Sequence, residues 1–298
     1  MADDVMDHEH ETAHCLFVSD LHGSVEQYLK LLHVIRMESP SAVFLGGDLL
    51  PSGFHVGGFN GYTASDFVEE FLLAQFLLLH AQMKEYYPRI FVIMGNDDLR
   101  CYEPAIAEGE HRGAWEYVHN RKAPFGDFQV YGYSYVPPTP FLLKDWERYD
   151  VSRYVDPGSI SPEEGHRSVP VREDECTLST IRDDLELLAG NDALNRAIFL
   201  FHAPPHDSML DRAALEGKMV DHVPLDLHVG SIAIRRFIES RQPLLTLHGH
   251  VHESARLTGS WRDRIGRTYS FSAAHDGPDL AVVRFDPRHL DSAKRELI

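Results

Sequence analysis

Eight short runs of apolar residues are spaced along the chain, and each has the length and composition of a buried β-strand. The runs are residues 13–18, 42–45, 89–94, 128–133, 196–201, 243–247, 267–272 and 279–285. Most are continuous rather than alternating and are bounded by turn residues, which is typical of strands that are buried on both faces.

Helical patterns lie between several of these runs. Residues 24–37 open with Ser24 and Gln27, the spacing of a capping box, and continue with apolar residues at helical intervals. The other candidates are the long apolar segment 64–87 and the shorter segments 178–189 and 231–240. Strand–helix–strand order in the first hundred residues favours parallel strands joined by right-handed crossovers.

Three polar segments interrupt this pattern. Residues 144–176 are rich in charges and predict an irregular surface excursion rather than a linker between domains. Residues 1–12 contain five acidic residues and no basic one, and they predict a disordered tail. Residues 13–298 are then expected to form a single domain. The loop 51–63 is rich in glycine and aromatic residues and is a candidate to line a site.

The composition narrows the class of protein. Among 298 residues, 43% are hydrophobic and 25% are charged, as in ordinary soluble proteins. No apolar run reaches the roughly 18 residues of a membrane span, and the acidic start does not resemble a signal peptide. The three cysteines, Cys15, Cys101 and Cys176, are too widely spaced to suggest a disulfide framework. We therefore expect a reduced, cytoplasmic protein without a membrane partner. Nothing in the sequence indicates an oligomeric state.

The formal net charge of −18 argues against one class of partner. Proteins that bind long nucleic acids usually present a basic face, and no basic patch is evident along this chain. A long nucleic acid is therefore not expected as a substrate, whereas a nucleotide remains compatible with the charge.

Five of the apolar runs end in residues of the types that bind metal ions. In chain order these residues are Asp20, His22, Asp48, Asn96, His202, His250 and His252. In open α/β sheets, ligands gather outside the carboxyl ends of the strands, so the five segments are expected to converge. Mixed imidazole, carboxylate and amide ligands suit Mn²⁺, Fe or Zn²⁺ better than Mg²⁺ or Ca²⁺. The absence of cysteine from the set argues against a structural zinc site.

The order of these motifs resembles that of the calcineurin-like metallophosphoesterase family. The matching motifs are Asp20-Leu21-His22, Gly47-Asp48, Gly95-Asn96, His202 and Gly249-His250-Val251-His252. The resemblance implies an α+β fold, a four-layer αββα sandwich of the metallo-dependent phosphatase type. It also implies two metal ions. Asp20, His22 and His252 would bind one ion, Asn96, His202 and His250 would bind the other, and Asp48 would bridge them.

This resemblance implies an enzyme that hydrolyses phosphate esters. Two neighbouring divalent cations suit phosphoryl transfer, and we expect attack of a metal-bound hydroxide on phosphorus. Mn²⁺ is the expected metal, with Fe or Zn²⁺ as alternatives. Two other functions stay open. One is a phosphomonoesterase or protein phosphatase, and the other is a weakly active, metal-holding binding or regulatory module.

The third motif departs from the family pattern. The family has histidine after Gly-Asn, whereas this chain reads Gly95-Asn96-Asp97-Asp98. Asp97 therefore occupies the position of a catalytic histidine and is the candidate catalytic residue. A carboxylate that is ionised beside cations is a poor proton donor and repels phosphate. This suggests that phosphodiesters or activated esters are preferred over ordinary monoesters.

Other residues are candidates to contact the phosphate in its place. His206 is the candidate for substrate binding, and Arg100 and His228 are further possibilities. By strand alternation, His248 is expected to point away from the metals. Cys101 is expected to be a small buried residue. Substrate specificity is expected to depend on loops 51–63, 101–125 and 203–229.

Overall fold

The computed structural model describes residues 13–52 and 66–298. The predicted disordered tail, residues 1–12, lies outside the described residues, as does most of the candidate loop 51–63. Within the described part of the chain, no helix combines the length and the hydrophobicity that a membrane span requires.

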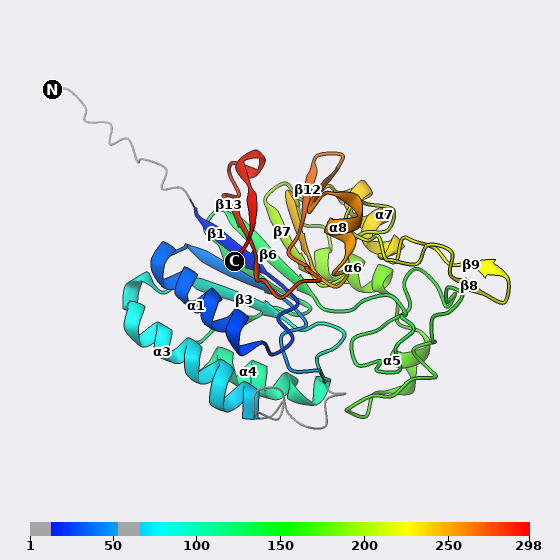
Figure 1. The fold of residues 1–298 in the computed structure, drawn as a ribbon, viewed down its shortest axis with the longest axis horizontal. Coiled ribbons are helices and arrows are strands. Elements are labelled where there is room, and N and C mark those ends of the chain that lie inside the picture. The colour runs from blue at the N-terminus through cyan, green and yellow to red at the C-terminus, as the bar shows by residue number, and fades with distance from the viewer. Residues whose placement is uncertain (1–12, 53–65) are drawn as a thin grey trace.

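Two six-stranded sheets form the centre of the molecule (Figure 1). In spatial order, the first sheet consists of β14 (Lys294–Leu297), β13 (Ala281–Phe285), β1 (Cys15–Val18), β2 (Ala42–Gly46), β3 (Arg89–Ile93) and β4 (Glu116–Tyr117). The second consists of β11 (Arg262–Ile265), β12 (Thr268–Ser272), β10 (Leu245–His248), β7 (Ala197–Phe201), β6 (Phe128–Tyr133) and β5 (Arg121–Phe125). Strands β1 to β4 pair in parallel, as do β12, β10, β7 and β6.

Both faces of the central strands are buried, which explains why their sequences are continuously apolar. In β1, Phe17 packs in the cluster between the two sheets, whereas Leu16 and Val18 pack in the cluster beneath the helices. In β7, Leu200 lies between the sheets and Phe201 contacts Phe237 of a covering helix. Successive side chains of a strand thus pack alternately into the core between the sheets and the core beneath the helices.

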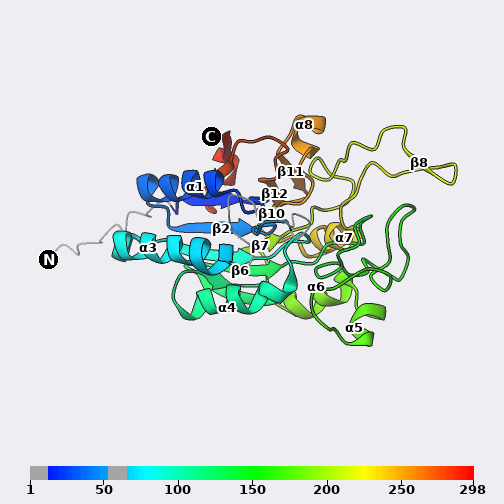
Figure 2. The same cartoon turned by 60° about the horizontal axis from the view of Figure 1, so that its bottom comes forward.

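Helices cover the outer faces of both sheets (Figure 2). The first sheet is covered by α1 (Val25–Glu38), the π-helical segment η1 (Phe67–Leu73), α3 (Ala74–Met83) and α4 (Glu103–His111), and the second by α6 (Ile181–Ala189) and α7 (Ile232–Arg241). Shorter elements are η2 (Lys84–Tyr86), η3 (Arg100–Tyr102), α5 (Glu173–Thr177), α8 (Ser254–Thr258), η4 (Leu290–Ser292), and the hairpin of β8 (Met219–Val220) and β9 (Val223–Pro224). This arrangement confirms the predicted four-layer αββα sandwich.

All eight predicted strands and the four predicted helices are present. The hydroxyl of Ser24 caps α1 by accepting the Gln27 N–H at 3.4 Å, as the spacing suggested. The reciprocal half of the capping box is absent, because the Gln27 side chain donates to the carbonyls of Pro278 and Asp279 instead.

The excursion 144–176 is irregular, as predicted, up to the short helix α5, which begins at Glu173, and the prediction that it lies on the surface is wrong for its first seven residues. Lys144 and Glu147 are both buried, and their charged groups are 2.5 Å apart. Lys144 Nζ also donates to the Thr139 carbonyl at 2.9 Å. Burial is possible because these charges pair with each other and with the backbone. The prediction that Cys101 is buried is also wrong, because this residue is exposed.

Candidate metal centre

The residues that follow five parallel strands meet at one end of the two sheets. The loops after β1 and β2 are joined by backbone hydrogen bonds, from Asp20 N–H to the Gly47 carbonyl and from His22 N–H to the Asp48 carbonyl. The loop after β10 is tied to the end of β7, because Gly249 N–H donates to the His202 carbonyl at 2.9 Å. These bonds hold together the loops of each sheet, and His250 N–H, which donates to Asp20 Oδ1 at 3.0 Å, joins the loops of the two sheets.

One group of four side chains has the arrangement of a metal-binding site. Each of Asp20, His22, Asp48 and His252 offers a ligand atom, and these four atoms all lie within 4.8 Å of one another. The Nε2 atoms of His22 and His252 are 3.2 Å apart, and His252 Nε2 lies 3.4 Å from Asp20 Oδ1. Two atoms bound to one ion at about 2.1 Å lie about 3.0 Å apart in octahedral and about 3.4 Å apart in tetrahedral geometry. The observed spacing therefore fits a divalent cation.

A second group of ligand atoms adjoins the first. His202 Nε2 lies 3.0 Å from Asn96 Oδ1 and 3.3 Å from Asp48 Oδ2. The rings of His202 and His250 are 5.3 Å apart. The same Oδ2 atom of Asp48 lies 3.9 Å from His22 Nε2 in the first group. One carboxylate oxygen thus stands between two sets of candidate ligands.

Hydrogen bonds on the far side of two imidazole rings orient them towards these groups. His202 Nδ1 lies 2.8 Å from the Gly46 carbonyl, which can only accept, so Nδ1 carries a proton and Nε2 is the nitrogen that a metal ion would bind. His22 Nδ1 lies 3.3 Å from Asp97 Oδ2, leaving Nε2 to face His252. Such partners fix both tautomer and ring orientation in metal sites.

The backbone is strained at several of the candidate ligands. Asp20, His22, Asp48 and His250 all have positive φ angles, of 60°, 43°, 52° and 74°. Non-glycine residues seldom adopt this conformation, and it persists only where the surrounding structure imposes it. Four of the seven candidate ligands are thus held in an unfavourable backbone conformation, which is typical of functional sites.

Close approach of the loops explains two glycines of the sequence motifs. A β-carbon on Gly95 would lie 2.3 Å from Asp48 Oδ1 and 2.5 Å from the Asp48 nitrogen. A β-carbon on Gly249 would lie 2.0 Å from Ser19 Oγ and 2.7 Å from Asp20 Oδ2. Only glycine leaves room for these carboxylates.

Buried carboxylates and imidazoles shift one another's pKa values at the site. Burial alone would raise the pKa of Asp48, but the charge of His202 and its hydrogen bond hold that pKa well below its usual range. Burial alone would lower the pKa of His22 and of His202, but the neighbouring carboxylates have the larger effect. The hydrogen bond from His22 to Asp97 and the charge of Asp48 raise the pKa of His22 to about 9, and Asp48 raises that of His202 to about 9. Burial and the neighbouring His202 lower the pKa of His250 to about 3. Ionised carboxylates grouped in this way favour the binding of a cation.

Asp98 is a supporting residue to which the sequence motifs assigned no role. Its buried carboxyl group accepts N–H groups from Leu49 at 2.9 Å, Leu50 at 2.8 Å and Gly95 at 2.8 Å. It thereby joins the loop after β2 to the loop after β3. Burial and the charge of Asp48 raise its pKa to about 7. Nothing in the sequence indicated that Asp98 is buried beside Gly95 and Asp48.

The remaining candidates have polar partners outside the two groups. His206 Nε2 is 3.3 Å from Asp226, and Arg100 donates to Glu175 at 2.9 Å. His228 Nδ1 lies 2.8 Å from Asp211. His248 is buried, and its two nitrogens bond the Ala203 carbonyl and Thr246 Oγ1, each at 2.8 Å, which confirms that it points away from the site.

Known proteins resemble this chain in both sequence and fold. The family model described as calcineurin-like phosphoesterase matches residues 13–254. The solved structure of TT1561 of Thermus thermophilus matches 96% of this chain and 99% of its own, with 16% identity and a TM-score of 0.58. A second solved chain matches the same shares, with 17% identity and a TM-score of 0.59. At these identities the two structures show a shared fold. No curated protein sequence is significantly similar to the chain.

Proposed function

The chain belongs to the calcineurin-like phosphoesterase family, and we propose that it hydrolyses phosphodiesters at a centre that holds two divalent cations. In this proposal Asp20, His22 and His252 hold one cation. Asn96, His202 and His250 hold the other, and Asp48 bridges the two.

The position of Asp48 is the observation that supports this proposal most strongly. Its Oδ2 atom lies 3.3 Å from His202 Nε2 and 3.9 Å from His22 Nε2, between the two groups of ligands. A bridging carboxylate reduces the repulsion between two cations that are close together. Cations held there would neutralise phosphate oxygens and lower the pKa of a bound water, which is the chemistry that ester hydrolysis needs. Mn²⁺ is the proposed metal, with Fe or Zn²⁺ also compatible with this mixture of ligands.

The carboxylate of Asp97 favours diesters over monoesters. Its Oδ2 lies 3.3 Å from His22, at the edge of the proposed first cation site. A phosphodiester carries one negative charge, whereas a monoester carries close to two at neutral pH. Repulsion from Asp97 therefore costs a monoester more than a diester. Asp97 also cannot donate a proton to a poor leaving group while it is ionised.

Side-by-side kinetics test the proposal. Hydrolysis of bis-p-nitrophenyl phosphate and of p-nitrophenyl phosphate is measured with Mn²⁺ and with a chelator. We expect turnover that requires Mn²⁺, with a higher kcat/KM for the diester. Preference for the monoester would contradict the role given to Asp97. No turnover of either substrate by protein that holds two metal ions would indicate a binding module instead.

Replacing Asp97 with histidine tests the diester preference separately. Asp97→His removes a negative charge and supplies a possible proton donor, so hydrolysis of an alkyl phosphate monoester is expected to rise at least tenfold, a small part of the roughly 100- to 10,000-fold that general acid catalysis typically contributes. The measurement is the steady-state rate on that monoester at saturating Mn²⁺. Equal rates for Asp97→His and the wild type would count against this account of Asp97.

A further inference from the structure

A cavity of about 560 Å³ opens beside the candidate metal centre. His250, a proposed ligand, is one of its lining residues, and so are Val251 and Glu253 of the same loop. A group bound in the cavity would therefore lie next to a phosphate bound at the metals. The volume is within the range of sites that bind small organic molecules.

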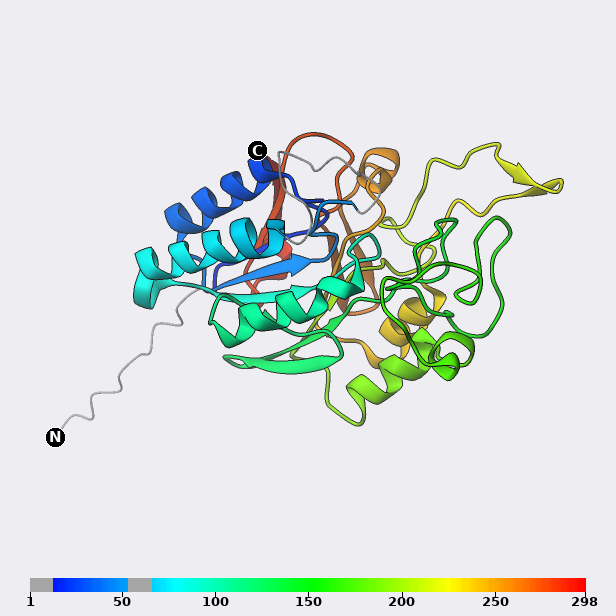
Figure 3. The same cartoon turned by 90° about the horizontal axis from the view of Figure 1, so that it is seen from below.

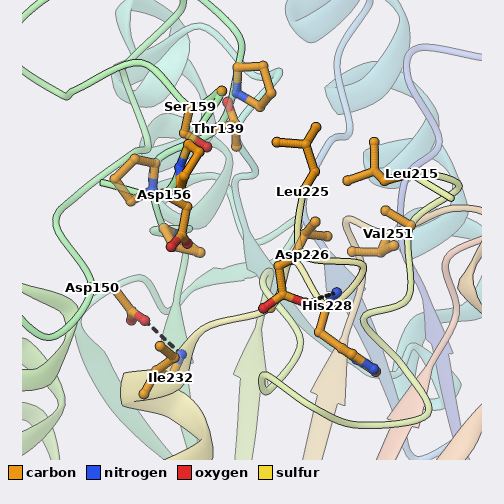
Figure 4. A pocket seen from close by; sticks show the side chains of 18 of the residues that line it. Thr139, Asp150, Asp156, Ser159, Leu215, Leu225, Asp226, His228, Ile232 and Val251 are labelled. Carbon is orange, nitrogen blue, oxygen red and sulfur yellow. Dashed lines mark hydrogen bonds between the residues drawn. The ribbon is translucent and has the colours of Figure 1, made fainter. Parts of the chain in front are cut away.

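Two long irregular segments form most of the walls (Figure 4). One is residues 137–159, which follow β6, and the other is residues 213–230, which include β8 and β9. Both extend from the same end of the sandwich (Figure 3). The two walls approach each other closely at Gly158 of the first segment. A β-carbon on Gly158 would lie 3.3 Å from Val220 and 3.4 Å from Leu225 of the second segment.

Much of the lining is apolar. It includes Leu215, Leu225, Val229, Ile232 and Val251, together with four prolines of the first wall. Figure 4 shows Leu215 and Leu225 on the side of the cavity opposite Thr139 and Ser159. Phe141 and Tyr154 also line it and are largely exposed. Large apolar side chains that are exposed around a hollow are typical of binding sites.

The charged groups of the lining are acidic. Among the described residues that line the cavity, four are Asp or Glu and none is Lys or Arg. Asp150 is satisfied within the fold, because it accepts N–H groups at the start of α7. Asp226 is 3.3 Å from His206. The carboxylate of Asp156 has no hydrogen-bond or ion-pair partner among residues 13–52 and 66–298. The cavity therefore presents the Asp156 carboxylate without a direct partner of opposite charge.

We propose that this cavity binds the organic group of the phosphoester and selects groups that are largely apolar and either uncharged or cationic. The inference rests on the proposed function, because it assigns the cavity to a substrate of the same centre. Binding of an apolar group is favourable because it removes apolar surface of both the group and the wall residues from water. A cationic group is attracted by Asp156 and by the aromatic ring of Tyr154, which also lines the cavity. An organic group with further negative charge meets repelling carboxylates and neither a lysine nor an arginine.

Three diesters that differ in the charge of one ester group test the selection. Each carries p-nitrophenol as the common leaving group, and the second ester group is 3,3-dimethylbutyl, 2-trimethylammonioethyl or 2-carboxyethyl. The first two groups have nearly the same shape and differ by one positive charge. The methyl p-nitrophenyl diester is the reference. We expect KM for the first two diesters to be at least tenfold below that of the methyl ester, and KM for the carboxyethyl ester to be no lower.

Two variants assign this effect to the cavity. Asp156→Asn is expected to raise KM severalfold for the trimethylammonioethyl ester and to leave the dimethylbutyl ester unchanged. Leu225→Ala is expected to raise KM for both. Glu85→Gln is the control, since Glu85 is exposed in η2, before the start of β3.

Binding to metal-free protein gives a second readout. In calorimetry, 2-trimethylammonioethyl phosphate should bind more tightly to the wild type than to Asp156→Asn. Equal KM values for all four diesters, or variants that change none of them, would overturn the inference while hydrolysis of the methyl ester still supports the proposed function. Absence of hydrolysis of every ester would instead overturn the proposed function.

Discussion

The carboxylate of Asp97 contacts the nitrogen of the His22 ring that does not face His252. Its Oδ2 is 3.3 Å from His22 Nδ1, whereas His22 Nε2 faces His252 Nε2 at 3.2 Å. Ser52 Oγ donates to the other oxygen of Asp97 at 3.2 Å. A carboxylate in this place fixes the tautomer of a metal-binding histidine and increases its basicity. We infer that Asp97 positions His22, in addition to its proposed effect on the choice of ester.

Removing the charge of Asp97 should weaken metal binding. Asp97→Asn retains the shape of the side chain but makes a weaker partner for His22, so the Kd for Mn²⁺ is expected to rise about tenfold. Calorimetric titration of metal-free protein measures this change, with Glu85→Gln as the control. An unchanged Kd would show that Asp97 does not act through His22.

A methyl group at Gly95 should displace Asp48. In Gly95→Ala the new β-carbon would lie 2.3 Å from Asp48 Oδ1, and the clash involves the Asp48 backbone as well. We expect loss of Mn²⁺ binding and at least a hundredfold loss of activity. Gly126→Ala is the matched control, because Gly126 has a positive φ angle but no atom within 4 Å of the added carbon. It should lower the free energy of unfolding by about 1 kcal/mol and leave Mn²⁺ binding intact.

At the scale of elements, the sequence predicted the central strands and missed the edges. Strands such as β2 and β7 are buried on both faces, so their composition alone distinguishes them. The edge strands β5, β11 and β14 are largely exposed and charged, as in the segments RKAPF and RDRI. Charged edges prevent strands from pairing with other chains, and they also remove the hydrophobic pattern on which strand prediction depends.

The chain crosses from the first sheet to the second between β4 and β5, and His119 is buried at this crossing. Its Nδ1 accepts the Ser134 N–H at 3.0 Å. Burial, with the charges of Arg148 and Arg100, lowers the pKa of His119 to about 3. The unfolded chain, in which the pKa of histidine is about 6.5, therefore takes up a proton first as the pH falls. The contribution of neutral His119 to stability is complete above pH 6.5 and is lost progressively towards pH 3.

Replacing His119 should thus reduce the acid sensitivity of the fold. His119→Gln keeps an acceptor for Ser134 but does not titrate. Between pH 6 and 4 its free energy of unfolding should depend on pH less steeply than that of the wild type, by about 1.4 kcal/mol per pH unit. Urea denaturation of metal-free protein at several pH values measures both slopes. Equal slopes would mean that His119 is not buried in its neutral form.

At the scale of the whole molecule, the candidate metal centre was predictable and the cavity was not. Each candidate ligand directly follows a strand that the sequence reveals, and parallel strands bring their carboxyl ends together. The cavity is formed by residues 137–159 and 213–230, which have no periodic pattern. Loop 203–229 was expected to affect specificity, but nothing in the sequence indicated that residues 137–159 would lie opposite it.

The central claim is that one chain holds two cations around Asp48 and uses both for hydrolysis. Titration of Mn²⁺ into metal-free protein, with hydrolysis of bis-p-nitrophenyl phosphate followed at each step, tests it most directly. The account predicts two equivalents bound per chain, activity that rises with the second, and loss of both in Asp48→Asn but not in Glu85→Gln. Full activity with one equivalent, or undiminished activity in Asp48→Asn, would contradict it.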